Sequence, residues 1–423
     1  MKLTTYEQNM LDGLEGEDKQ FAMKLIVQVA EAMDASRLQE ISQAHVVDTL
    51  TTGTGETGPE YAYKLRDMQA KVAVPTTINV GNIDLKNPEN NVPAEYAFEV
   101  SREVMNIYKD MGCEPTYTCS PFQEPANQLS LGQHVAWGES SAVPFANSVF
   151  GARTSRYGQF IASCAAICGR VPYAGLHVTE NRRAEIVISI ENLPDHFKDM
   201  GLFYHILGYR VGQIVSEKIP VIIGIDPDIS RDHLKAFGAA AATSGGIGMF
   251  HMVGITPESP TLEDALQHQA AEDYHEITLV ELDTVLQELT ENEVGQALEA
   301  VAFGAPHLSY DEVIEIFHLF EDVDWDIQLP VYIAMSRRTQ DEIEANGMIK
   351  KFDEADITIV ADRCVYYAGI LWDDGLKVMT DSAKWAHYAP KCIDAEVTIG
   401  SFKDCVDSAV AGKVVLQGFS EEE

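Results

Sequence analysis

Short apolar runs rich in β-branched residues constrain the fold of this chain most strongly. They occupy residues 186–190, 221–225, 331–334 and 357–361. Such compact runs are typical of strands buried in a sheet that is covered on both faces. Because helical patterns separate the runs, the sequence predicts an α/β fold.

Apolar spacing predicts helices between these strands. Residues 5 to about 70 are expected to be helical, interrupted by a polar, glycine-rich loop at 51–59. Residues 71–80 are strand-like because β-branched side chains are dense there. A turn at 226–230 leads into a helix. A Ser-x-x-Glu capping-box pattern at 309–312 predicts that another helix begins there.

Length and charge narrow the class of protein. The 423 residues allow two or three domains, and weak changes of composition near residues 150 and 260 indicate subdomain boundaries. With 66 acidic and 30 basic residues the net charge is −36. This charge repels phosphate backbones and anionic lipids, so it argues against a nucleic-acid binder and a membrane-surface binder.

The N-terminal sequence and the scattered cysteines indicate a reducing compartment. The N-terminus has no basic head followed by an apolar run, so no secretory signal is visible. Seven cysteines are scattered through the chain, and we interpret them as reduced thiols of a cytoplasmic protein. The composition favours an enzyme that acts on a small molecule.

Four cysteines are placed where they could reach a site. Cys113 and Cys119 lie in a loop-like segment with prolines, and Cys392 also follows a loop-like stretch. Cys364 follows the apolar run at 357–361, where α/β proteins display site residues. No Cys-x-x-Cys pair is present, which gives a structural zinc site little support, whereas an iron–sulfur cluster held by distant cysteines remains open. The other three are expected to be buried in helices: Cys164, Cys168 and Cys405.

Polar clusters supply further candidates, each with an alternative explanation. Glu139 and Ser140 follow a glycine and form either a ligand cradle or an ordinary helix start. Arg153 and Arg156 stand beside hydroxyls, so they are suited either to capture a carboxylate or phosphate or to pair with surface acids. His307 is either a helix-entry histidine or a site residue.

The densest constellation lies at residues 379–388. It holds the Ser382 hydroxyl, the Lys384 amine and the His387 imidazole within six residues, flanked by aromatic rings that could exclude water. We predict that these three side chains are catalytic.

Several segments together resemble one family, aconitase X, the outlying branch of the aconitase-type hydro-lyases. The likeness runs from about residue 45 to residue 415. It rests on motifs such as Pro-Thr-Tyr-Thr-Cys-Ser-Pro at 115–121, Trp-Gly-Glu-Ser-Ser-Ala at 137–142 and Lys-Trp-Ala-His-Tyr-Ala-Pro at 384–390. Further matching segments lie at 74–81, 146–154, 164–170 and 408–413.

The resemblance implies a fold and an activity. It implies an aconitase-like catalytic core of several α/β subdomains around a central cleft. Members dehydrate small hydroxy acids with an iron or iron–sulfur centre, namely cis-3-hydroxy-L-proline in bacteria and mevalonate 5-phosphate in archaea. The first substrate is favoured because the segments at 79–81 and 156–158 look more like the hydroxyproline branch.

The resemblance also implies site residues. Cys119 and Cys364 would be iron ligands, and Glu139 would meet the metal or the substrate. Lys384 would hold the substrate anion. The remaining substrate-binding positions implied here are Asn79, Ser140 and Arg153.

Two departures from the family pattern leave the third metal ligand open. The phosphomevalonate branch has Gly-Cys-Pro-His where this chain has Gly-Ala-Pro-His at 304–307. The hydroxyproline branch often has a cysteine where this chain has Thr49. Cys113 or Cys392 is a candidate replacement, and a mononuclear site of two cysteines and Glu139 is equally compatible.

Aconitase-type enzymes also need a small swivelling domain, which this sequence does not show. The resemblance therefore implies a separate small subunit as a partner. One alternative activity is that of a mevalonate 5-phosphate dehydratase large subunit. Another is a non-catalytic, metal-free binding subunit of the same fold.

Overall fold

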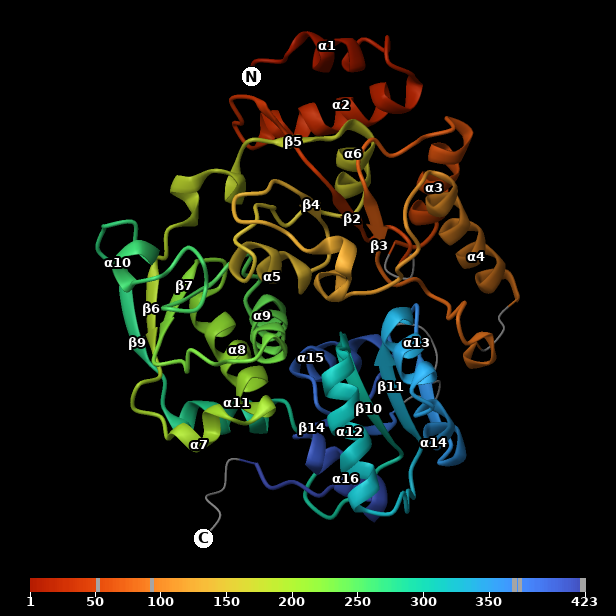
Figure 1. The fold of residues 1–423 in the computed structure, drawn as a ribbon, viewed down its shortest axis with the longest axis vertical. Coiled ribbons are helices and arrows are strands. Elements are labelled where there is room, and N and C mark those ends of the chain that lie inside the picture. Colours follow the sequence, from red (N-terminus) through yellow and green to blue (C-terminus); the bar gives the residue numbers. More distant parts are fainter. Residues whose placement is uncertain (51–53, 92–94, 367–370, 372–374, 419–423) are drawn as a thin grey trace.

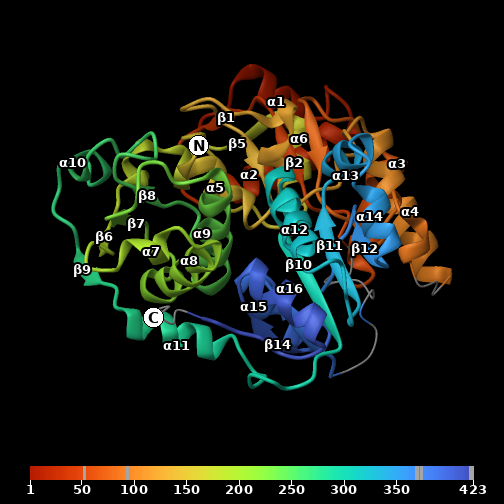
Figure 2. The same ribbon diagram turned by 60° about the horizontal axis from the view of Figure 1, so that its bottom comes forward.

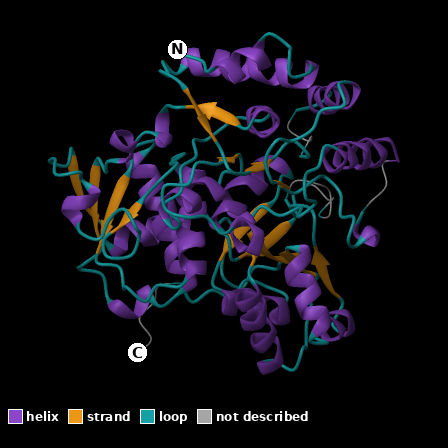
Figure 3. Ribbon diagram, turned by 45° about the horizontal axis from the view of Figure 1, so that its top comes forward, coloured by secondary structure: helices purple, strands orange, loops and turns teal. Residues whose placement is uncertain are grey.

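Three parallel sheets organise the molecule. The computed structural model describes residues 1–50, 54–91, 95–366, 371 and 375–418. The strand orders are β3-β2-β4, β8-β7-β6-β9 and β12-β11-β10-β13-β14, and a small antiparallel pair joins β1 to β5. Figure 3 shows each group of strands flanked by helices. This confirms the predicted α/β fold.

The first body contains the three-stranded sheet and lies at the top of Figure 1. Its strands are β1 Leu38–Glu40, β2 Ala44–Val46, β3 Thr76–Ile78, β4 Ala136–Trp137 and β5 Arg170–Pro172. Its helices are α1 Thr5–Leu11, α2 Glu17–Ala32, α3 Thr57–Asp67, α4 Glu95–Asp110, α5 Ala142–Ser148 and α6 Ile161–Cys168. Short 3₁₀ helices are η1 Pro88–Asn90, η2 Pro121–Gln123, η3 Pro125–Asn127, η4 Gly175–His177 and η5 Thr179–Arg182.

The second body contains the four-stranded sheet, on the left of Figure 1. Its strands are β6 Ile186–Ser189, β7 Pro220–Ile223, β8 His251–Met252 and β9 Asp273–Glu276. Its helices are α7 Asp195–Lys198, α8 Gly201–Val215, α9 Arg231–Ser244, α10 Leu262–Ala265 and α11 Leu279–Glu288.

The third body contains the five-stranded sheet, at the lower right of Figure 1. Its strands are β10 Ala300–Leu308, β11 Val331–Met335, β12 Ile357–Val360, β13 Lys377–Thr380 and β14 Glu396–Ile399. Its helices are α12 Tyr310–Asp322, α13 Arg337–Ala345, α14 Ile349–Glu354, α15 Ala383–Cys392 and α16 Phe402–Ala411. Figure 2 shows α15 between α9 and the five-stranded sheet.

The apolar runs of the sequence form strands whose side chains are buried on both faces of the sheet. All four residues of β6 are buried, as are four of the five in β11. The predicted capping box is present: the Ser309 hydroxyl accepts a hydrogen bond from the backbone of Glu312, whose carboxylate accepts one from the backbone of Ser309.

Two local predictions were wrong. Within the region expected to be helical, residues 38–40 and 44–46 form β1 and β2, which are too short to show a sequence period. Of the loop predicted at 51–59, residues 51–53 lie outside the described part of the chain, and α3 already begins at Thr57. Cys392 is not in a loop, because α15 continues through Pro390 and ends at Cys392. In the described part of the chain, no helix combines the length and apolar character that crossing a membrane requires.

A buried lysine joins the second body to the third. The Lys235 ammonium on α9 forms ion pairs with Asp232 on the same helix, at 3.1 Å, and with Glu312 on α12. Its side chain is 3% exposed. Burial lowers the Lys235 pKa, but the two carboxylates outweigh this and raise it to about 12, so the side chain stays charged.

We expect Lys235→Met to lower the free energy of unfolding by about 3 to 5 kcal/mol, because two carboxylates would be left without their buried cation. Urea unfolding followed by tryptophan fluorescence measures this. The control is Lys403→Met, which breaks an exposed pair with Asp407 on α16 and should cost less than about 1 kcal/mol. Equal losses in the two variants would contradict the prediction.

Candidate functional site

A pocket of about 160 Å³ lies where two parallel sheets meet. It opens at the carboxyl ends of strands from the first and third bodies, where ligands usually bind in open parallel sheets. The lining residues come from loops after β2, β3, α4, β4 and β12 and from helix α15: Leu50, Val80, Cys119, Glu139, Ser140, Cys364, Tyr366, Lys384 and Tyr388.

Helix α15 brings a lysine into this pocket. The five-stranded sheet reverses its strand order between β10 and β13, which creates a crevice at their carboxyl ends. The chain leaves β13 there and starts α15, capped by the Ser382 hydroxyl, which accepts a hydrogen bond from Trp385 N at 3.1 Å. Lys384 lies in the first turn, so its ammonium lies in the crevice.

A buried ion pair contributes to the lining of the pocket. Lys384 Nζ lies 2.8 Å from Glu139 Oε1, and the two side chains are 6% and 12% exposed. Burial alone would raise the pKa of Glu139, but the Lys384 charge and hydrogen bond lower it to about 2. Burial would likewise lower the pKa of Lys384, whereas Glu139 and the nearby thiols raise it above its usual value. Both groups are therefore charged.

Neighbouring polar groups fix the Glu139 carboxylate. Asn79 Nδ2 donates to Oε2 at 2.8 Å, and the Ser140 hydroxyl donates to Oε1 at 2.9 Å. Lys384 also donates to Ser140 Oγ at 3.2 Å. The structure thus brings together Asn79, Glu139, Ser140 and Lys384, which were singled out in the sequence.

Two cysteines from different bodies meet beside this ion pair. The Cys364 thiol hydrogen-bonds to Cys119, and this bond lowers the pKa of Cys119 to about 5. The same bond, with burial, raises the pKa of Cys364 well above its usual value. The backbone N–H of His307 also donates to Cys119 Sγ at 3.2 Å. The hydrogen bond therefore favours the thiolate form at Cys119 and the thiol form at Cys364.

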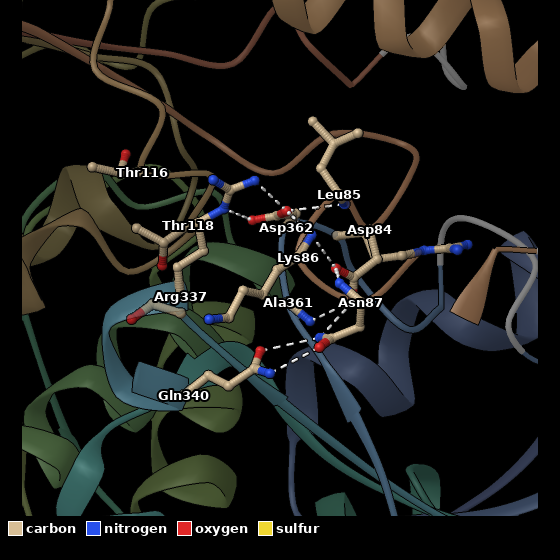
Figure 4. Close-up of polar contacts among 12 residues, drawn as sticks. Asp84, Leu85, Lys86, Asn87, Thr116, Thr118, Arg337, Gln340, Ala361 and Asp362 are labelled. Atoms are coloured by element: carbon tan, nitrogen blue, oxygen red, sulfur yellow. Dashed lines mark hydrogen bonds and ion pairs between the residues drawn. The ribbon is translucent and has the colours of Figure 1, made fainter. Parts of the chain in front are cut away.

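A polar network clamps the loop that carries Cys364 to the first body (Figure 4). The Asp362 carboxylate accepts two hydrogen bonds from Arg337, at 2.5 and 2.7 Å, and is fully buried. The backbone N–H groups of Leu85 and Lys86 donate to the same carboxylate at 3.0 and 2.9 Å. Asp362 therefore fixes the backbone two residues before Cys364.

A second carboxylate makes the clamp reciprocal. Asp84 accepts from Ala361 N at 2.8 Å and from Asn87 N at 2.7 Å. Burial raises the pKa of Asp84 to about 6. Asn87 and Gln340 exchange amide hydrogen bonds at 3.1 and 2.8 Å, as Figure 4 shows.

The donor set fits a metal bound through two protein sulfurs. Thiolates are suitable ligands for iron, and Cys119 and Cys364 supply two sulfurs, of which Cys364 would lose its proton when a metal binds. Within the described residues, no group of three or more His, Cys, Asp or Glu side chains is arranged to hold a metal ion. The Thr49 hydroxyl is bonded to the Asn79 and Val80 carbonyls, so its place provides no sulfur. A cluster held by three protein cysteines does not fit this arrangement.

Other residues singled out in the sequence lie outside the pocket lining. The Ser382 hydroxyl donates to the Ala305 carbonyl, and His387 Nδ1 pairs with the Tyr209 hydroxyl at 2.7 Å. Arg153 donates to the His177 carbonyl at 2.9 Å. Cys113 is buried, which raises its pKa to about 12, and Cys392 is exposed at the end of α15.

The sequence analysis did not identify part of the pocket lining or the hydrogen-bond network around Asp362. Val80 and Tyr366 line the pocket without having been singled out, whereas Tyr388 belongs to the aromatic rings at 379–388 that were expected to exclude water. Arg337 reaches Asp362 from α13. The proximity of Asp362 to Cys364 was a weak signal for the clamp. The sequence carries no signal for its partner, because Arg337 is 25 residues away in the chain.

Three family models match the chain: Aconitase X first domain over residues 1–180, second domain over 184–287 and third domain over 298–411. The crystal structure of Thermococcus kodakaraensis aconitase X (holo-form) superposes with a TM-score of 0.86 at 29% identity. That match covers 97% of this chain and 100% of that one.

Curated relatives fall into two groups. Cis-3-hydroxy-L-proline dehydratases of Hypocrea jecorina and Pseudomonas aeruginosa are each 35% identical over 97% of this chain, and this match spans 69% and 70% of their lengths. The phosphomevalonate dehydratase large subunit of Thermococcus kodakarensis is 33% identical over 92% of this chain and 95% of its own length.

We expect Arg337→Gln to lower the free energy of unfolding by about 2 to 4 kcal/mol, since it leaves the buried Asp362 carboxylate without a counter-charge. Chemical denaturation measures the change. The neighbouring Arg338→Gln is the control: it removes an exposed i,i+4 pair with Glu342 and should cost less than about 1 kcal/mol. If both variants were as stable as the unmodified chain, the clamp would have no energetic role.

Proposed function

Because this chain belongs to the aconitase X family, we propose that it removes water from cis-3-hydroxy-L-proline or a close analogue. The family members named among its curated relatives are dehydratases, so the chain is a hydro-lyase. The observation that supports this choice of substrate is that, among the described residues that line the pocket of about 160 Å³, Lys384 is the one cation.

The charge of the pocket favours a small carboxylic acid. Lys384 is the one lysine or arginine among its lining residues. One ammonium matches one carboxylate, whereas phosphate sites usually gather several donors, often with arginine. The 35% identity to two cis-3-hydroxy-L-proline dehydratases supports the same choice.

The residues of the pocket can be given roles on this basis. Dehydration removes a proton from the carbon beside the carboxylate and the hydroxyl from the next carbon. Lys384 binds the carboxylate and, by neutralising it, makes that proton easier to remove. Glu139 and Ser140 hold Lys384 in place. Tyr366 and Tyr388, stacked with ring centroids 6.0 Å apart, form a wall that excludes water from the bound acid.

Iron is the proposed cofactor, and Cys119 and Cys364 are the residues that would hold it. Glu139, expected from the sequence as a further ligand, is instead bonded to Lys384, Asn79 and Ser140. When bound, iron would supply Lewis acidity to help the hydroxyl leave. The chain's own contribution is to keep one thiolate and one thiol together in a buried place, as the hydrogen bond between them does. Ser382 and His387 stay candidates for proton transfer, although neither lines the pocket.

A small companion subunit is part of the proposal. The chain matches 95% to 98% of phosphomevalonate dehydratase large subunits, whose name implies a small one. It matches about 70% of the cis-3-hydroxy-L-proline dehydratases, so about 30% of each lies outside the match. The proposed companion corresponds to that remaining part.

The near-complete match to large subunits also favours a second candidate, dehydration of mevalonate 5-phosphate.

The chain purified from its native host with its companion should dehydrate cis-3-hydroxy-L-proline and leave mevalonate 5-phosphate unchanged. Product formation on each acid, followed by mass spectrometry, measures this. Turnover of the phosphate ester alone would replace the first proposal with the second.

Replacing Lys384 should abolish most activity. We expect Lys384→Met to reduce kcat/KM by about 100- to 1,000-fold, the loss typical of one charged group that stabilises a transition state. Lys391→Met, on the same helix but exposed, is the matched control and should retain activity. Circular dichroism establishes that both variants fold; a folded, fully active Lys384→Met enzyme would refute the assigned role.

A further inference from the structure

His307 lies behind the two cysteines and contacts both of the loops that carry them. It is fully buried, near the end of β10, and does not line the pocket. Its imidazole bonds to Thr118 through Nδ1, at 3.2 Å, and to the Arg363 carbonyl through Nε2, at 3.1 Å. These two residues immediately precede Cys119 and Cys364. One ring therefore spans the two cysteine loops.

The hydrogen bonds define the proton position on the ring. A carbonyl oxygen only accepts, so Nε2 carries the proton and donates it to Arg363. Nδ1 then accepts from the Thr118 hydroxyl, whose oxygen in turn accepts from Ser120 N at 3.1 Å. Every polar atom of this chain of contacts is satisfied, which favours one fixed ring orientation.

The backbone of His307 strengthens the same link. Its N–H donates to Cys119 Sγ at 3.2 Å, and its carbonyl accepts from the Ser120 hydroxyl at 3.1 Å. The segment around Cys119 comes from the first body, whereas Cys364 follows β12 of the third. The network at Asp362 and Asp84 ties the Cys364 loop to residues 84–87 of the first body, whereas His307 ties it to the segment that carries Cys119 itself.

We propose that His307 is a positioning residue that sets the separation of the Cys119 and Cys364 sulfurs. It acts through Thr118 and Arg363 and touches neither substrate nor sulfur with its side chain. The inference rests on the proposed function only in that the thiol pair is the proposed metal site; the geometry itself involves no metal. The role predicts that substituting His307 changes the chemistry of the thiol pair in the metal-free chain.

Two probes of sulfur separation test this without substrate. Cadmium ion, added to the metal-free full-length chain, gives an ultraviolet sulfur-to-metal charge-transfer band when both thiolates bind it. Phenylarsine oxide condenses with two adjacent thiols, forming two As–S bonds and releasing one water, and a thiol titration counts the loss. His307→Leu should weaken cadmium binding about 10- to 100-fold, the usual effect of removing a group that orients metal ligands. It should also slow the arsenical reaction.

Matched variants separate positioning from stability. His251→Leu removes another buried imidazole that bonds to a backbone carbonyl, that of Arg182 at 2.8 Å, in the second body. It should leave both thiol readouts unchanged. His307→Gln retains a donor and an acceptor on one side chain and should recover most of the cadmium affinity. Thr118→Val removes only one of the two imidazole bonds and should give an intermediate loss.

Each result of these thiol measurements either supports or overturns the positioning role of His307. If folded His307→Leu bound cadmium and phenylarsine oxide as the unmodified chain does, the proposal would be overturned. If His307→Leu failed to fold, the comparison of Thr118→Val with the unmodified chain would decide, and an unchanged cadmium affinity would reject the proposal. Failure of the dehydration assay with these thiol results intact would count against the proposed function alone.

Discussion

The buried ion pair of Lys384 and Glu139 is the contact on which the architecture of the site depends. It connects the start of α15, in the third body, to the loop after β4, in the first. Removing two charges from water is costly, and well-packed apolar side chains in their place are often as stable or more so. Here Asn79 and Ser140 satisfy further lone pairs of the carboxylate, which offsets part of that cost. A charged pair kept beside a pocket is therefore explained by the chemistry of the pocket rather than by stability.

The large negative charge of the chain gives this one lysine its importance. Buried cations of this chain have carboxylate partners: Arg182 pairs with Glu258, Arg170 with Glu7 and Lys384 with Glu139. Of these three, Lys384 is the one that lines the pocket. An acidic surface slows the approach of an anion, so binding depends on local positive charge within the crevice. Lys384 can hold a carboxylate because its field acts at short range in a place where water is scarce.

The sequence predicted what depends on local patterns and failed where distant contacts decide. The runs that became β6 and β11 were recognisable because full burial requires consecutive apolar residues. The helix at 5–70 was wrong in part, since strands of three residues have no period of their own. In the site, Cys119 and Lys384 stood out by their motifs. Arg153 matched an anion-binding pattern equally well, yet it donates to the His177 carbonyl, a partner that only the folded chain defines.

The same distinction applies to the groups that hold the site in place. Arg337 and Asp84 each reach the loop of Cys364 from another segment, and neither has a motif that marks it. Together they fix the first body against the third before any ligand binds. Asp362 holds the loop of Cys364 against residues 85 and 86 of the first body through buried hydrogen bonds. The ordering of the site is thus completed during folding, which lowers the entropy cost of binding later. In the proposed complex, motion that admits the substrate would then come from the companion subunit, since these two bodies are already locked together.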